Sequence, residues 1–186
     1  MSRKTILLII LLTVITTGLL ILAIASQKEE IEQLSTTSPT VSPTPNEAIL
    51  SLSQSNQTTK TDGTKQVDLW IDTGKNKVTA IQMELAYDPN VLSDIKVVPA
   101  FFIENPVILF NQVDTKNGRV SFAVGISSPD KTLSGKGIIA TINYRVLPSA
   151  KADNTTLHFL SKTGVSAEGI KGTVLKETND LNLLLK

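Results

Sequence analysis

The chain has 186 residues, with 18 Lys and Arg against 17 Asp and Glu, a formal net charge of +1 and no cysteine. A near-neutral chain lacks the positive field that attracts phosphate backbones, which argues against nucleic-acid binding. The absence of cysteine excludes disulfides, thiolate zinc sites and thiol nucleophiles. The length suffices for one domain with a sizeable core plus appendages.

A long apolar segment lies near the amino terminus. Residues 6–25 contain no charge, and Arg3 and Lys4 precede them. Such a run is long enough to cross a bilayer as a helix, and the basic pair predicts that residues 1–5 stay cytoplasmic while the rest is exported. The alternative is a signal peptide cleaved after Ala25, because Ala23 and Ala25 form a small-residue cleavage pattern. We therefore expect a single-pass cell-membrane protein with an extracellular domain, or a secreted one after cleavage.

Residues 26–46 predict a juxtamembrane segment followed by a linker. The second part, residues 35–46, is rich in Ser, Thr and Pro and almost free of apolar side chains. A segment of this composition cannot bury a core and behaves as an extended, semi-stiff spacer. The folded domain is therefore expected to span residues 47–186.

Short runs of alternating apolar residues follow, separated by turn residues, as in a β-sandwich. Residues 79–92 show the pattern best, with Ile81, Met83 and Leu85 on one side of a strand that Pro89 ends. Asn117-Gly118 predicts a type I′ hairpin turn. The nine expected strands lie at residues 48–52, 67–71, 79–87, 95–98, 108–113, 119–126, 138–146, 157–159 and 181–185. They predict an all-β, two-sheet sandwich.

Four segments carry a resemblance to a known family. They are YDPNVL at residues 87–92, VDLWIDTG at residues 67–74, GIIATINYRV at residues 137–146 and GTVL at residues 172–175. In their order and spacing they resemble bacterial cohesin domains over most of residues 47–186. The resemblance implies a nine-stranded jelly-roll sandwich, with no enzymatic activity and no cofactor, that holds dockerin modules.

The resemblance also implies a partner-binding face on the sheet that contains the third, fifth, sixth and eighth strands. Mapped onto this sequence, that face consists of Ala80, Gln82, Glu84, Arg119, Ser121, Ala123 and His158. Cellulosomal cohesins carry an Asn and an Asp that accept hydrogen bonds from dockerin, and Ala80 and Gln82 stand at those two positions. The implied partner is a dockerin-like or other surface protein.

Two other functions remain open. Trp70 is expected to point outward and offers possible sugar stacking, as in a carbohydrate-binding module that takes a polysaccharide. A structural envelope spacer without a specific ligand is the second alternative. His158 is the only histidine and has no partner pattern for a triad or a metal site, so no metal is expected. Phe101 and Phe102 either plug the end of the sandwich or form an exposed sticky patch.

Overall fold

The computed structural model describes residue 16, residues 46–55, 62–126 and 132–185. The chain divides into two compact units, residues 1–41 and 42–186, and the first contains only one described residue, Thr16, which is helical. Apart from Thr16, the membrane segment predicted at residues 6–25 lies outside the described residues, as do residues 1–5, predicted to be cytoplasmic, and nearly all of the predicted linker. Within the described residues, no helix is long and apolar enough to cross a membrane.

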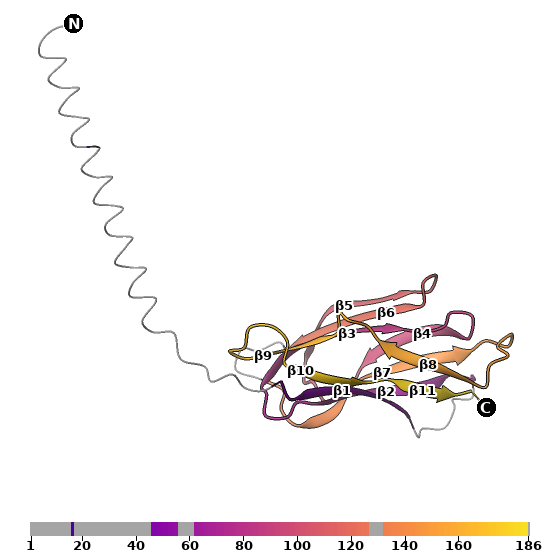
Figure 1. Ribbon diagram of the computed structural model, residues 1–186, viewed down its shortest axis with the longest axis horizontal. Coiled ribbons are helices and arrows are strands. Elements are labelled where there is room, and N and C mark those ends of the chain that lie inside the picture. The colour runs from indigo at the N-terminus through magenta and orange to yellow at the C-terminus, as the bar shows by residue number, and fades with distance from the viewer. Residues whose placement is uncertain (1–15, 17–45, 56–61, 127–131, 186) are drawn as a thin grey trace, which may run out of the picture. The chain divides into compact units, whose positions relative to one another are not determined.

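The second unit is a sandwich of two β-sheets (Figure 1). One sheet has the order β10-β1-β2-β7-β4, and the other has the order β11-β8-β3-β6-β5, with β9 paired to β3. The strands are β1 Ala48–Gln54, β2 Lys65–Asp72, β3 Val78–Ala86, β4 Leu92–Pro99, β5 Pro106–Asp114, β6 Arg119–Ile126, β7 Lys136–Val146, β8 Asn154–Phe159, β9 Gly164–Ala167, β10 Leu175–Asn179 and β11 Leu181–Leu184. The predicted all-β, two-sheet sandwich is confirmed.

The core lies between the two sheets and follows the predicted alternation. On β3, Ile81, Met83 and Leu85 are buried, and the residues between them face outward. Phe122 of β6 and Tyr144 of β7 are the largest fully buried side chains of the same core. Because β3 lies inside its sheet and contributes buried side chains along its length, it fixes which face of that sheet meets solvent.

The prediction of nine strands is wrong, because the described residues form eleven. The two additional strands are β9 and β10. β9 is only four residues long, and β10, with the sequence LKETN, has no buried residue. Burial does alternate along β9, but four residues are too few for the pattern to stand out in the sequence. β10 forms through backbone pairing with β1, in parallel.

The hairpin between β5 and β6 is confirmed, but its predicted turn type is wrong. Asp114 pairs with Arg119, so four residues connect the strands, and of these only Gly118 has a positive φ, of 62°. A type I′ turn needs two such residues. The Asp114 carboxylate stabilises the turn instead, because it accepts hydrogen bonds from the backbone N–H groups of Lys116 and Asn117, both at 3.1 Å.

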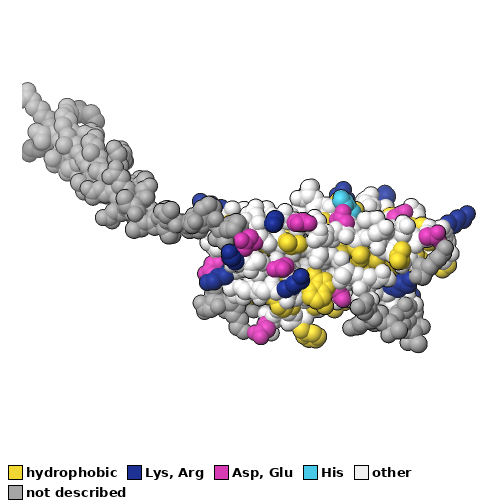
Figure 2. Space-filling model, turned by 60° about the horizontal axis from the view of Figure 1, so that its bottom comes forward, with side chains coloured by type: hydrophobic (Ala, Val, Ile, Leu, Met, Phe, Trp, Pro, Cys, Tyr) yellow, Lys and Arg dark blue, Asp and Glu magenta, His cyan; other side chains and the backbone are white. Residues whose placement is uncertain are grey.

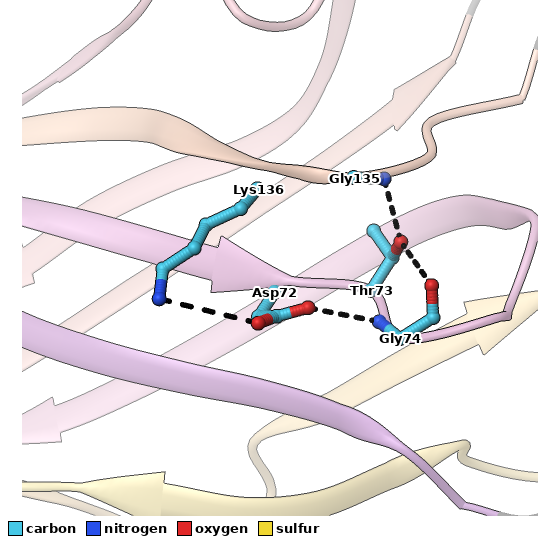
Figure 3. A network of polar contacts seen from close by, with 5 residues as sticks. All are labelled: Asp72, Thr73, Gly74, Gly135 and Lys136. Carbon is cyan, nitrogen blue, oxygen red and sulfur yellow. Dashed lines mark hydrogen bonds and ion pairs between the residues drawn. The ribbon is translucent and has the colours of Figure 1, made fainter.

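The loop between β2 and β3 is held to the start of β7 by a polar network (Figure 3). The buried Thr73 hydroxyl accepts a hydrogen bond from the Gly135 N–H at 2.8 Å and donates to the Gly74 carbonyl at 3.3 Å. Asp72 accepts the Gly74 N–H at 3.1 Å and lies 4.0 Å from the Lys136 ammonium. These contacts fix the point from which β3 enters its sheet.

Candidate docking face

The residues predicted for partner binding lie in cross-strand rows on the outer face of the sheet containing β3. β3 pairs with β6 on one side and with β8 and β9 on the other. The rows are His158–Ala86–Arg119, Glu84–Ser121, Gly164–Gln82–Ala123 and Ser166–Ala80–Gly125. The structure therefore brings all seven predicted residues together on one surface, which we call the docking face.

Exposure varies across this face. Ala80, Gln82, Glu84 and Ser121 are half-buried, whereas Arg119 and His158 are exposed. Ala123 is only 3 % exposed, although it lies on the outer face by register. Its neighbours across the sheet are Gln82 and Phe110, and larger neighbours shield a side chain as short as that of alanine. Ala123 therefore contributes shape to the face rather than a projecting contact.

Side-chain hydroxyls hold β9 in place beside β3. The Thr163 hydroxyl accepts the Glu84 N–H and donates to the Glu84 carbonyl, both at 3.1 Å. The hydroxyl thus takes the place of a strand partner for Glu84, which lies between the part of β3 that pairs with β8 and the part that pairs with β9. On the other edge of β9, the Thr173 hydroxyl accepts the Val165 N–H at 3.0 Å and donates to the Val165 carbonyl at 3.2 Å. Two threonines thus satisfy backbone groups that a continuous strand would satisfy.

A shallow groove of about 440 Å³ crosses the half of the docking face nearer β9. Uncharged residues of β3, β6 and β9 line it, together with two apolar residues of β5 and three uncharged residues of the segment after β9. Its lining consists of Ala80, Ile81, Gln82, Leu109, Phe110, Ala123, Gly164, Val165, Ser166, Ile170, Gly172 and Thr173. None of these residues is charged, so the groove suits an apolar side chain of a partner.

The charged groups of the face lie in its other half. Arg119 and His158 occupy one row with Ala86, and Glu84 lies in the next row. The His158 Nδ1 contacts a carboxylate oxygen of Asp180, whose other oxygen accepts the Phe159 N–H at 2.8 Å. The docking face therefore combines an uncharged groove with a charged region beside it.

The turn before β6 helps to position Arg119. The side-chain amide of Asn117 donates to Asp114 at 2.7 Å, and this bond, together with the backbone N–H groups of the turn, lowers the pKa of the Asp114 carboxyl group. Attraction to Arg119 lowers it further. The carboxylate is therefore ionised at neutral pH and keeps the turn closed at the end of the face where Arg119 projects.

Four further residues of the groove were not predicted from the sequence, namely Leu109, Phe110, Gly164 and Ile170. The positions of Leu109 and Phe110 could not be predicted because β5 has a register irregularity between Ile108 and Phe110. It breaks the alternation that shows where side chains point. Gly164 lies in the unpredicted β9, and Ile170 lies outside any strand. The only signal was the run of apolar residues at 107–110.

Trp70 lies on β2, in the opposite sheet, so the structure does not bring it to the docking face. It is half-buried, pairs with Ser51 and Ile138, and donates its indole N–H to the Ser53 hydroxyl at 2.8 Å. Its polar group is thus satisfied within the sheet. In the view of Figure 2, apolar side chains form several groups among charged and polar ones.

The acidic side chains of Asp68, Asp88 and Asp94 make structural contacts. Asp68 accepts from the Thr141 hydroxyl at 3.2 Å, Asp88 accepts the Asn90 N–H at 2.8 Å, and Asp94 lies 3.7 Å from Arg145. In the part of the chain that the structure describes, no group of three or more His, Cys, Asp or Glu residues could hold a metal ion.

The comparison with known families decides the assignment. The cohesin domain family matches residues 50–181, which is more than half of the chain. The chain belongs to the cohesin domain family. No curated protein matches it.

Solved cohesin structures share the fold. CaCohA2 of Clostridium acetobutylicum, in complex with a variant of CaDoc0917, is 17 % identical with a TM-score of 0.59 over 75 % of this chain and 100 % of that one. The third cohesin of ScaC from Acetivibrio cellulolyticus, in complex with the ScaB dockerin, is 18 % identical with a TM-score of 0.59 over 75 % and 99 %. A non-cellulosomal cohesin from the archaeon Archaeoglobus fulgidus is 18 % identical with a TM-score of 0.51 over 73 % and 88 %. At these identities the likeness concerns the fold.

Proposed function

We propose that this cohesin domain is a non-catalytic module that docks a partner protein on the face formed by β8, β9, β3, β6 and β5. The observation that carries the proposal is the arrangement of that face, where an uncharged groove lies beside Glu84, Arg119 and His158. An apolar groove with polar groups at its margin is a usual anatomy for protein recognition. Little backbone change is expected on binding, because the face is built on paired strands.

The proposed partner is a dockerin-like protein. Cohesins of the same fold have been solved with dockerins bound. In this chain the two positions at which the resemblance places hydrogen-bond acceptors hold Ala80 and Gln82, both of which line the groove. The partner segment that contacts them is therefore proposed to be apolar. The charged half of the face is proposed to orient the partner.

The proposed setting is the outside of the cell membrane. Residues 6–25 would anchor the chain, and residues 26–46 would hold the domain away from the surface. This part of the proposal rests on the sequence alone, and cleavage after Ala25 would release the same domain in secreted form.

Charge reversal on the docking face tests the proposal. Replacing Gln82 and Glu84 together by Lys places two ammonium groups in the central rows of the face, so we expect loss of partner binding. Substitution of partly exposed strand residues usually costs less than about 0.5 kcal/mol in folding stability. The measurement is the amount of partner retained by the full chain and by the variant.

The matched control is the pair Glu177→Lys and Asn179→Lys on β10. Both residues are exposed, β10 belongs to the other sheet, and the change in net charge is the same. The control should bind as the original chain does. Equal loss in both variants would show a non-specific charge effect, and full binding by the Gln82/Glu84 variant would place the site elsewhere.

Sugar binding by Trp70 is the alternative function, and the same binding experiment distinguishes it from protein docking. Trp70 is the only tryptophan, and its indole N–H is already bonded to Ser53. A sugar-binding face usually presents several aromatic rings, so the structure favours protein docking. Recovery of a polysaccharide that Trp70→Ala abolishes and Gln82→Lys leaves unchanged would reverse this choice.

A further inference from the structure

Apolar side chains are exposed along one side of the sandwich, where β4, the following loop and β5 succeed one another. Six large apolar side chains are exposed among the described residues, and five of them are Val98, Phe101, Val107, Ile108 and Leu109. Phe101 is fully exposed, and Leu109 is 60 % exposed. Exposed apolar side chains are normally scattered, so this concentration within residues 98–109 indicates an interaction surface.

The same segment contains a free sheet edge. β5 is the last strand of its sheet, and its outer edge has no backbone partner among the described residues. β4 is the corresponding edge strand of the other sheet, and the Asn111 side-chain amide bridges the two by donating to the Val97 carbonyl at 2.9 Å. This bridge keeps β5 beside β4 without covering the β5 backbone.

The other edge strands carry features that prevent edge-to-edge pairing. β10 carries Lys176 and Glu177, and β11 is only four residues long. β4 has a register shift after Ser93, charged residues and a terminal Pro99. Charges, proline, short length and irregularities are the devices by which natural edges avoid pairing.

β5 has a proline and a charge only at its two ends and one register irregularity, but it has neither a short length nor a charge in its interior. It is nine residues long, and the residues from Pro106 to Val113 are uncharged. Its irregularity leaves Leu109 without a partner in β6, which adds an apolar side chain to the exposed surface. A long, uncharged and apolar edge strand is a template for another strand.

We propose that β5 pairs with β5 of a second copy of this chain in antiparallel fashion. A strand pairing with itself about a two-fold axis meets its own sequence reversed, so any charge near the axis would oppose its like. β5 has none there. With pairing centred on Phe110, Asp114 of each copy lies opposite Pro106 of the other, so the two carboxylates are about 26 Å apart at ~3.3 Å per residue.

The charges around β5 also favour a second copy of the chain over a lipid surface as its partner. The charged residues that flank the uncharged run on either side, Glu104 and Asp114, are both acidic. Anionic headgroups attract basic flanks and are repelled by acidic ones. A second copy presents instead the same uncharged strand and the same exposed Val107 and Leu109.

Pairing of this kind joins the two sheets edge to edge and turns both outer faces to the same side. If the docking face functions as proposed, the dimer presents two docking faces for bivalent binding. The dimer itself does not depend on that function, and its test requires no docking partner.

Cross-linking tests the dimer in the full chain. Because the sequence has no cysteine, Gln112→Cys introduces a single thiol on β5, where the side chain is exposed. Asn179→Cys on β10 is the matched control, since it is also exposed on an edge strand. We expect a flexible bis-maleimide to yield a covalent dimer with Gln112→Cys and little with Asn179→Cys.

Leu109→Lys in the Gln112→Cys chain supplies the specific test, because it places two like charges close to the axis. We expect the dimer yield to fall to that of the Asn179→Cys control, with an unchanged melting temperature because Leu109 is mostly exposed. An unchanged yield, or equal yields from the two cysteine variants, would overturn the proposal. Cross-linking of Gln112→Cys to a different protein would overturn it as well and identify a heterologous partner for this edge.

Discussion

At the scale of single residues, the clearest anomaly is the hydroxyl group of Tyr144. The side chain is 1 % exposed, and its oxygen has no hydrogen-bond partner among the described residues. Burial raises the pKa of this phenol above its ordinary value near 10. A buried polar group without a partner costs about 1–3 kcal/mol, so the ring is retained for its volume at some cost in stability.

Tyr144→Phe should therefore stabilise the domain by about 1 kcal/mol at neutral pH, because it removes the unpaired hydroxyl and keeps the ring. The raised folded-state pKa means that the folded domain holds the phenol proton more tightly than the unfolded chain does. The free energy of unfolding is therefore unaffected by the titration of this group below about pH 10 and falls as the pH rises through the folded-state pKa. The advantage of the variant should therefore grow in alkaline solution. Urea unfolding followed by Trp70 fluorescence at neutral and alkaline pH measures both effects. A large loss of stability at neutral pH would show that the hydroxyl has a partner.

Single residues also show where prediction of the site reached its limit. Gln82 and Glu84 were placed correctly on one face because regular alternation on β3 determines where side chains point. Leu109 and Phe110 were not, because the irregularity in β5 breaks that alternation. Phe101 is exposed, whereas Phe102 packs on Gly137. The sequence could not predict this difference, because the two residues are identical neighbours.

At the scale of secondary-structure elements, local patterns predicted the long strands and missed the short ones. β3, β6 and β8 alternate buried and exposed residues over much of their length, and all three were found. β9 pairs with β3 and alternates in burial, but it is only four residues long, and β10 forms through a parallel backbone ladder with β1 and has no buried residue. The β5–β6 turn was located by Asn117-Gly118, but the Asp114 carboxylate determines its form.

The β5–β6 turn gives a prediction about its glycine. A Cβ atom on Gly118 would lie 2.2 Å from the Tyr87 carbonyl oxygen, and the backbone there has a φ of 62°. Gly63 has a φ of 79° but nothing within 4 Å of its Cβ position. Gly63→Ala should therefore cost about 1 kcal/mol for the left-handed backbone, and Gly118→Ala about 2 kcal/mol or more beyond that.

Chemical denaturation of the two alanine variants measures this difference directly. Gly63→Ala is the matched control, because it shares the backbone strain and lacks the clash. Equal losses of stability would mean that the turn moves away from Tyr87 at little cost and does not hold the Arg119 end of the docking face in place.

At the scale of the whole molecule, the cohesin fold supplies two different surfaces on one sheet. The outer face of β8, β9, β3, β6 and β5 carries the groove and the charged rows, whereas the free edge of β5 carries exposed apolar side chains. Leu109 belongs to both. The resemblance in sequence indicated the first surface, and only the strand order, which requires long-range pairing, reveals that β5 is an edge.

The measurement that tests the central claim most directly is capture of partners from the extracellular and membrane fractions of the producing organism on the immobilised full chain. It is made with and without a calcium chelator, and with the Gln82/Glu84 and Glu177/Asn179 lysine variants alongside. The proposed function predicts one protein retained by the original chain and by the β10 control and lost from the docking-face variant. A dockerin, whose fold depends on bound calcium, would in addition be released by the chelator. Retention by all three chains, or of no protein at all, would contradict it.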